Sequence, residues 1–116
     1  MGLDAFVRRD LPEATADTPA CEELWYGRKK NEIHGWMQRQ SGIPADDFNC
    51  ERLPLTAAMM DHLEQDIRAK ALVATAGFFF GCANDCNEVT LAAEALLKAT
   101  RASLARNEQP YYFSWW

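Results

Sequence analysis

The 116-residue sequence contains no apolar run approaching the roughly 18–20 residues that a membrane-spanning helix requires. Its first ten residues lack the basic-then-apolar order of a secretory signal peptide. The cytoplasm is therefore the expected compartment. Repeats and low-complexity tracts are also missing, while apolar residues make up 48% and charged residues 25% of the chain. These values are typical of a globular domain and exclude a disordered chain, a collagen-like repeat and a coiled-coil rod.

Positive charge is scarce, because 12 Lys and Arg stand against 17 Asp and Glu, giving a net charge of -5 at pH 7. Non-specific nucleic-acid binding depends on clustered positive charge, so this class of protein is not expected. The sequence also has no G-x-S-x-G motif, no phosphate-binding loop and no H-E-x-x-H motif. An enzyme is the less favoured interpretation, and no cofactor is predicted.

Cysteine is limited to four irregularly spaced residues, Cys21, Cys50, Cys82 and Cys86. In a cytoplasmic chain they are expected to be free thiols. The Cys82-x-x-x-Cys86 spacing is compatible with zinc, and Cys50 with His34 can complete a ligand set. One loosely spaced pair is a weak zinc signal, so free thiols are favoured and no metal is predicted.

Aromatic residues are plentiful at 11%, including four Trp, and several of them lie in segments with strand character. Extended segments are predicted at residues 3–7, 24–27, 77–81 and 111–116. Helical spacing of apolar residues predicts helices over residues 30–40, from Thr56 onward and over residues 88–106. The sequence therefore predicts a single α+β domain over residues 1–116, with about three helices packed on a small antiparallel sheet. That sheet includes strands from both ends of the chain, and residues 44–54 are predicted to be a loop.

The ends of the predicted helices carry recognisable signals. Thr56 is the expected N-cap of the second helix, and Gly42 followed by a proline ends the first. Asp85 and Glu88 resemble a capping box before the third helix. Asn107 is suited to close that helix at its other end.

Three segments resemble, in order and spacing, the motifs of a family of small phage and prophage proteins. They are residues 25–36 (WYGRKKNEIHGW), 77–81 (GFFFG) and 112–116 (YFSWW). The opening Met-Gly-Leu-Asp and the Asn49-Cys50 pair extend the resemblance over nearly the whole chain. Some of those proteins are labelled phosphoglycerate kinase, which we disregard because that two-domain enzyme is several times longer. The resemblance implies work inside a bacterial cell and brings no established activity.

A candidate ligand site lies at the start of the first predicted helix, where the sequence places Arg28, Lys29, Asn31, His34 and Trp36. Unpaired backbone N–H groups at a helix start favour anions. An arginine, a histidine and an exposed indole beside them can hold a phosphate or carboxylate, with the ring stacked on a base or sugar. In the alternative interpretation Trp36 is core, His34 bonds a loop carbonyl and the cations are solvated.

Tyr112 and Trp116 are further candidate ligand-binding residues in the last segment. Alternation places two sets of side chains on opposite faces, namely Tyr111, Phe113 and Trp115 against Tyr112, Ser114 and Trp116. We expect the face of Trp115 to be buried and the face of Tyr112 to expose rigid amphipathic rings suited to binding. The alternative is that helices cover both faces.

The favoured function is that of a small phage or prophage accessory protein that binds a host protein or a small phosphorylated ligand. One alternative is an enzyme acting on a phosphorylated or nucleotide substrate, with His34 as acid–base and Arg28 and Lys29 as anion clamp. Another is a virion or assembly component, which would form a homo-oligomer.

Overall fold

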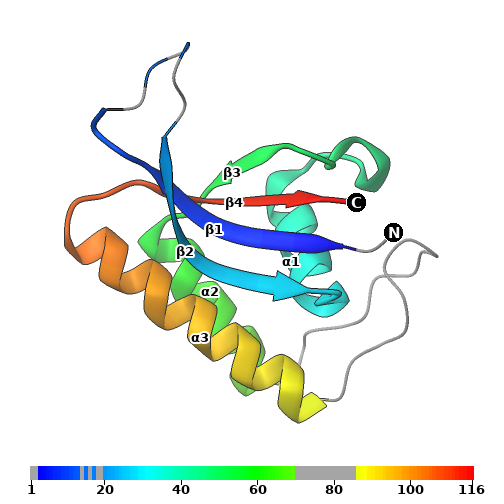
Figure 1. The fold of residues 1–116 in the computed structure, drawn as a ribbon. Helices are drawn as coiled ribbons and strands as arrows, with labels where there is room; N and C mark the ends of the chain where they lie inside the picture. The colour runs from blue at the N-terminus through cyan, green and yellow to red at the C-terminus, as the bar shows by residue number, and fades with distance from the viewer. Residues whose placement is uncertain (1–2, 14, 16, 18–19, 70–85) are drawn as a thin grey trace.

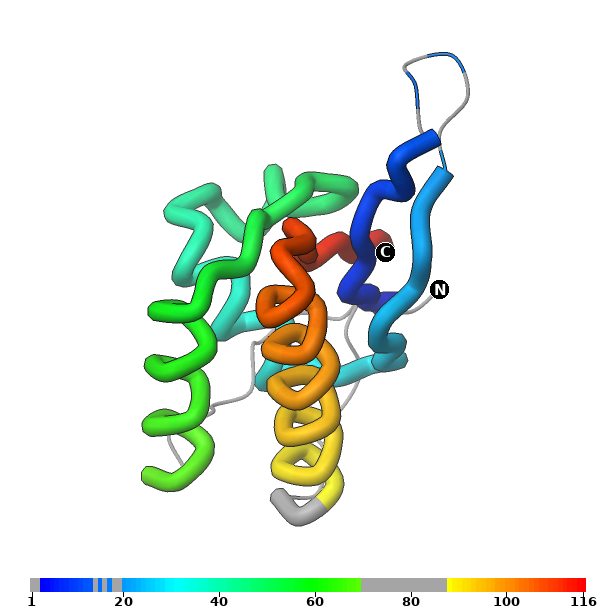
Figure 2. Tube along the Cα trace, turned by 90° about the vertical axis from the view of Figure 1, so that its left-hand side faces the viewer, coloured from blue at the N-terminus to red at the C-terminus, as the bar shows by residue number. Residues whose placement is uncertain are grey.

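The computed structural model describes residues 3–13, 15, 17, 20–69 and 86–116. Its elements follow the chain in the order β1 (Asp4–Asp10), β2 (Cys21–Arg28), α1 (Asn31–Ser41), a 3-10 turn (Ala45–Asp47), β3 (Arg52–Pro54), α2 (Ala57–Arg68), α3 (Cys86–Ala105) and β4 (Pro110–Trp115) (Figure 1). The strands form one antiparallel sheet in the order β2-β1-β4-β3. Figure 2 shows α1, α2 and α3 on the same side of this sheet. The predicted α+β domain is confirmed.

The two central strands come from opposite ends of the sequence. In β1 and β4, Asp4 lies opposite Trp115, Phe6 opposite Phe113 and Val7 opposite Tyr112. On its other side β1 pairs with β2, where a register shift follows Val7. Side chains that are about a hundred positions apart in the sequence are therefore cross-strand neighbours, as the predicted pairing of the terminal strands requires.

One strand was not anticipated. Residues 52–54, predicted as part of a loop, form β3 and pair with β4 at the edge of the sheet. Pro54 is tolerated there because an edge strand does not need every backbone N–H for pairing. The strand has only three residues, too few to show the alternation that predicts a strand. The predicted extended segment at residues 77–81 lies outside the described residues.

The predicted helix ends are confirmed wherever the structure describes them. The Thr56 hydroxyl accepts a hydrogen bond from the Met59 N–H at 3.2 Å, as an N-cap does. Gly42 ends α1 with a left-handed φ of 71°. Asn107 ends α3 with a φ of 62°, and the Glu108 N–H reaches back to the Ser103 carbonyl. Asp85, half of the proposed capping box, lies outside the described residues.

The core lies between the sheet and the helices, and Trp25 joins the two layers. Its indole donates from Nε1 to the Ala92 carbonyl of α3 at 3.1 Å. The same ring lies over Gly27, where an added Cβ would be 2.3 Å from a ring carbon. Glycine at position 27 therefore lets β2 approach α3 closely. The largest fully buried side chains of the described residues are Trp36, Tyr112, Phe48, Leu3, Ile33 and Met37.

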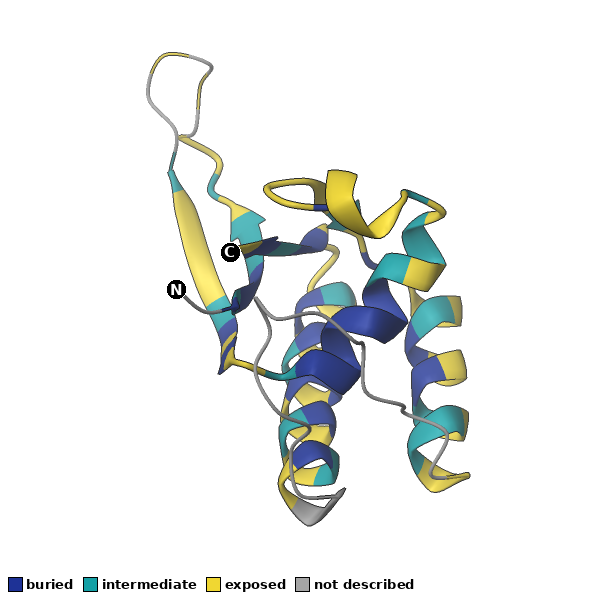
Figure 3. Ribbon diagram, turned by 90° about the vertical axis from the view of Figure 1, so that its right-hand side faces the viewer, coloured by how far each residue is buried: buried dark blue, intermediate teal, exposed yellow. Residues whose placement is uncertain are grey.

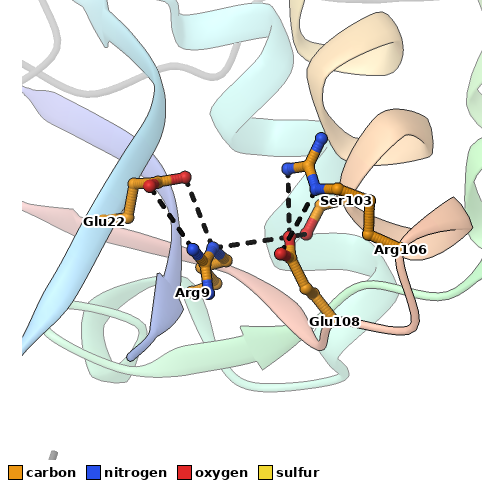
Figure 4. Close-up of polar contacts among 5 residues, drawn as sticks. All are labelled: Arg9, Glu22, Ser103, Arg106 and Glu108. Atoms are coloured by element: carbon orange, nitrogen blue, oxygen red, sulfur yellow. Dashed lines mark hydrogen bonds and ion pairs between the residues drawn. The ribbon is translucent and has the colours of Figure 1, made fainter. Parts of the chain in front are cut away.

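A network of ion pairs and hydrogen bonds holds the turn that connects α3 to β4 (Figure 4). Glu108 accepts from the Ser103 hydroxyl at 2.8 Å and from Arg106 at 3.0 Å, and its carboxylate lies 3.4 Å from Arg9 Nε of β1. Arg9 also pairs with Glu22 of β2 at 3.3 Å. These contacts hold the turn before β4 against β1, the strand with which β4 pairs.

Asn49 fastens the end of β4. Its Oδ1 accepts from the Trp116 N–H at 3.1 Å, and its Nδ2 donates to the Trp116 carbonyl at 3.5 Å. The Trp116 ring then meets the His34 ring edge-on, with centroids 4.9 Å apart. Trp115 points the other way and is 51% exposed, so the prediction that it is buried is wrong.

These placements predict that the two tryptophans contribute unequally to stability. Trp116→Ala removes an inward-packed ring and should lower the melting temperature by roughly 5–10 °C. Trp115→Ala removes a half-exposed ring and should lower it by about 4 °C or less. Thermal unfolding of both variants followed by circular dichroism tests this, and an equal or larger loss for Trp115→Ala would contradict the placement of the two rings.

Candidate functional site

The sequence-predicted site residues divide into exposed and buried ones. Arg28 and Lys29 are exposed at the turn from β2 to α1, as expected. Asn31, His34 and Trp36, which the same prediction placed beside them, are each no more than 2% exposed. Figure 3, coloured by burial, shows the first turns of α1 as buried. The structure therefore does not bring these five residues together around an accessible point.

Trp36 is part of the contact between two helices. Its Nε1 donates to the Asp66 carboxylate of α2 at 2.7 Å, and its ring meets the His62 ring edge-on at 5.6 Å. The prediction of an exposed indole that stacks on a ligand is wrong, because α2 packs against α1 at this position.

His34 lies in a closed aromatic cluster. Its Nδ1 is 2.9 Å from the Tyr112 hydroxyl, and its ring contacts those of Phe48 and Trp116. Burial lowers the pKa of His34 to about 4, so the ring is neutral at pH 7. Burial likewise raises the pKa of the Tyr112 phenol. A histidine enclosed in this way cannot exchange protons with a substrate in solvent, and the acid–base hypothesis for His34 is wrong.

The predicted binding residues Tyr112 and Trp116 do meet His34, but on the inner side of the sheet. Tyr112 is fully buried and Trp116 is partly buried. Alternation correctly separated the two faces of the final strand, but the face assigned to binding is the one that the helices cover. The accessible rings belong to the other face.

The sheet face directed away from the helices is the candidate site, and we call it the open face. Cross-strand pairing places on it ten aromatic or charged side chains from all four strands: Arg28, Tyr26, Glu23, Asp4, Phe6, Arg8, Trp115, Phe113, Tyr111 and Arg52. Their neighbours in β1 and β4, such as Val7 and Tyr112, belong to the buried core on the other side. Within the described part of the chain, no helix covers the open face (Figure 3).

Asp4 holds two of these rings in fixed positions. The Tyr26 hydroxyl donates to one carboxylate oxygen at 2.6 Å, and the Trp115 Nε1 donates to the other at 3.1 Å. Phe6 lies between the two, with ring centroids 5.2 Å from Tyr26 and 6.4 Å from Trp115. The hydrogen bond from Tyr26, helped by Trp115 and by the charge of Arg28, lowers the pKa of Asp4. The carboxylate is therefore charged at neutral pH and keeps both donors.

Two arginines lie over the other rings of the open face. The guanidinium carbon of Arg8 is 4.0 Å from the Phe6 ring centroid and 5.2 Å from that of Phe113. Arg52 covers Tyr111 at 4.4 Å in the same manner. These contacts combine cation–π attraction with burial of the ring faces. They explain why Phe6 is largely buried although no helix covers it.

The proposed zinc site can be checked only at the thiols that the structure describes, Cys21 and Cys50. Among the residues that the structure describes, no three His, Cys, Asp or Glu side chains are placed to hold an ion. Cys21 and Cys50 are exposed free thiols. The proposed ligand Cys82 and the side chain of Cys86 lie outside the described residues.

The burial of His34 predicts a specific pH dependence. Its pKa is about 4 in the fold against 6.5 ordinarily, so the unfolded chain takes up a proton in this range that the folded chain does not. The stability that depends on neutral His34 is therefore fully retained above about pH 6.5 and is lost as the pH drops. At pH 4 the free energy of unfolding should be lower by about 3 kcal/mol.

Denaturant unfolding of the wild type and of His34→Gln across this range measures the effect. The fall of the free energy of unfolding with decreasing pH should be smaller in His34→Gln. It should be retained in His62→Gln, since the His62 side chain is half exposed. An identical pH dependence in the wild type and His34→Gln would contradict the placement of His34.

Comparison with known proteins identifies no relative of this chain. Among the described residues, no helix is long and apolar enough to cross a membrane. The resemblance to small phage proteins stays a prediction. No family model, no curated protein and no solved structure matches the chain.

Proposed function

We propose that this chain is a small cytoplasmic phage or prophage accessory protein that acts by binding another protein through the open face. The observation that carries the proposal is the set of rings fixed by Asp4. Tyr26 and Trp115 are 47% and 51% exposed, yet each is held by a hydrogen bond to the same carboxylate. An exposed ring contributes less to the stability of the fold than a buried one does, but a ring held in a fixed position at the surface can contact a partner.

The chemistry of the open face matches that of protein interfaces. Tyr, Trp and Arg are the residue types most enriched among those that contribute strongly to binding. Because Asp4 and Phe6 already fix the rings, a partner would lose little side-chain entropy at this surface. Leu91 of α3 is also exposed, at 68%, but an isolated apolar side chain is common on protein surfaces.

The shape of the surface favours a protein over a small ligand. The rings of Tyr26, Phe6 and Trp115 lie on three adjacent strands and so extend across about 10 Å of sheet. Small ligands are usually enclosed in concave sites, whereas a sheet face offers a broad surface. The enzymatic alternative also loses its acid–base group, since His34 is buried.

Capture from bacterial lysate with matched variants tests this function. The double variant Tyr26→Ser, Trp115→Ser removes both exposed rings, and Leu91→Ser removes an apolar side chain of α3 that is more exposed than either. A partner should be retained by the wild type and by Leu91→Ser, and should be lost from the double variant by at least about tenfold in quantitative mass spectrometry. Circular dichroism confirms that each variant is folded.

Two results would count against the proposal. A partner that binds the double variant as well as the wild type would place binding elsewhere on the molecule. The absence of any partner that distinguishes the double variant from Leu91→Ser, across several bacterial hosts, would remove the reason for assigning a binding role to the open face.

A further inference from the structure

We infer that the partner presents carboxylates beside apolar side chains, and that Arg8 and Arg28 of the open face receive them. This inference rests on the proposed function and adds the chemistry of the partner. It is drawn from the hydrogen bonds that the charged groups of the open face already make, since a group without such bonds offers all of its donors or acceptors to a partner.

Two acids near the open face are already engaged within the protein. Asp4 accepts from Tyr26 and Trp115, one bond to each carboxylate oxygen. Asp10 accepts from Arg52 at 2.8 Å and from the Tyr111 hydroxyl at 3.4 Å. Arg52 is therefore engaged as well.

The other two arginines of the open face, Arg8 and Arg28, have N–H groups that can bind a partner. Among the described residues, neither Arg8 nor Arg28 has a hydrogen-bonded carboxylate partner, although Arg28 lies close enough to Asp4 to help lower its pKa. Arg8 lies over Phe6 and Phe113, which hold its guanidinium plane in place. A guanidinium stacked in this way presents its N–H groups at the edge of the plane, the geometry that binds a carboxylate through two hydrogen bonds.

Glu23 is the one acid of this face without an internal bond. It lies opposite Arg8 in the pairing of β1 with β2, and no ion pair joins the two side chains among the described residues. Counted together with the Arg52–Asp10 pair and with Asp4, whose carboxylate stays charged, the three arginines and three acids of this region balance. The preference for a carboxylate therefore comes from the position of the Arg8 guanidinium over Phe6 and Phe113 and its unbonded donors, and not from a net positive charge.

A protein segment explains this combination better than a nucleic acid does. Nucleic-acid binding draws most of its affinity from many phosphate contacts, and the open face has two available cations and no lysine. An acidic segment needs only one or two carboxylates for Arg8 and Arg28. Its apolar side chains would then pack on Tyr26 and Trp115.

Selection from a random peptide library displayed on a carrier tests this chemistry. Peptides of about ten residues, which span about 30 Å when extended, are long enough to cross the sheet. Wild-type protein should enrich peptides in which Asp or Glu adjoins aromatic or aliphatic residues. Their affinity should fall about tenfold or more in Arg8→Gln. It should rise about two- to threefold in Glu23→Gln, and stay unchanged in Arg39→Gln, whose side chain is exposed on α1.

Several results would overturn the inference. Enrichment of basic or uncharged peptides would do so, as would a failure to enrich any peptide whose binding depends on Arg8. Tighter binding of an oligothymidine than of any peptide, lost in Tyr26→Ser, Trp115→Ser, would indicate a nucleic acid instead. A captured partner that needs Tyr26 and Trp115 but tolerates Arg8→Gln, Arg28→Gln would leave the proposed function standing and reject the acidic segment.

Discussion

Tyr112 is fully buried between the sheet and the helices, so its hydroxyl needs a hydrogen-bond partner within the core. That partner is Nδ1 of His34 in α1, at 2.9 Å. A buried hydroxyl without a partner would cost about 1–3 kcal/mol. A slip of β4 by one residue would also turn Tyr112 to solvent and bring Trp115 into the core. This one contact therefore helps to fix which side chains of β4 point inward and how β4 pairs with β1.

The open face follows from that register. With Tyr112 inward, Trp115 points outward opposite Asp4, and Phe113 lies opposite Phe6. Asp4 can then bind Trp115 on one side and Tyr26 on the other, because β1 lies between β4 and β2. The same strand thus contributes a tyrosine to the core and a tryptophan to the surface proposed to bind a partner.

The helix ends and the pairing of the terminal strands could be predicted from the sequence, but which side chains the helices bury could not. The caps at Thr56, Gly42 and Asn107 depend on a few neighbouring residues, so sequence alone identified them. Alternation divided the last strand into two faces but did not indicate which one the helices cover. Sequence alone left open whether Trp36 is exposed or part of the core, because its burial depends on α2, a separate element. The alternation of Asp4, Phe6 and Arg8 in β1 was the available signal for the open face.

The accessibility of the Trp115 indole is the most direct test of the account. In nuclear magnetic resonance spectra of protein labelled with the nitrogen-15 isotope, a soluble paramagnetic chelate should broaden the Nε1–H signal of Trp115. It should spare those of Trp25 and Trp36, which are 8% and 2% exposed and donate to α3 and α2. Addition of the captured partner should then restore the Trp115 signal. A Trp115 signal that is spared from the start, or that stays broadened when the partner is bound, would contradict the assignment of the open face as the binding surface.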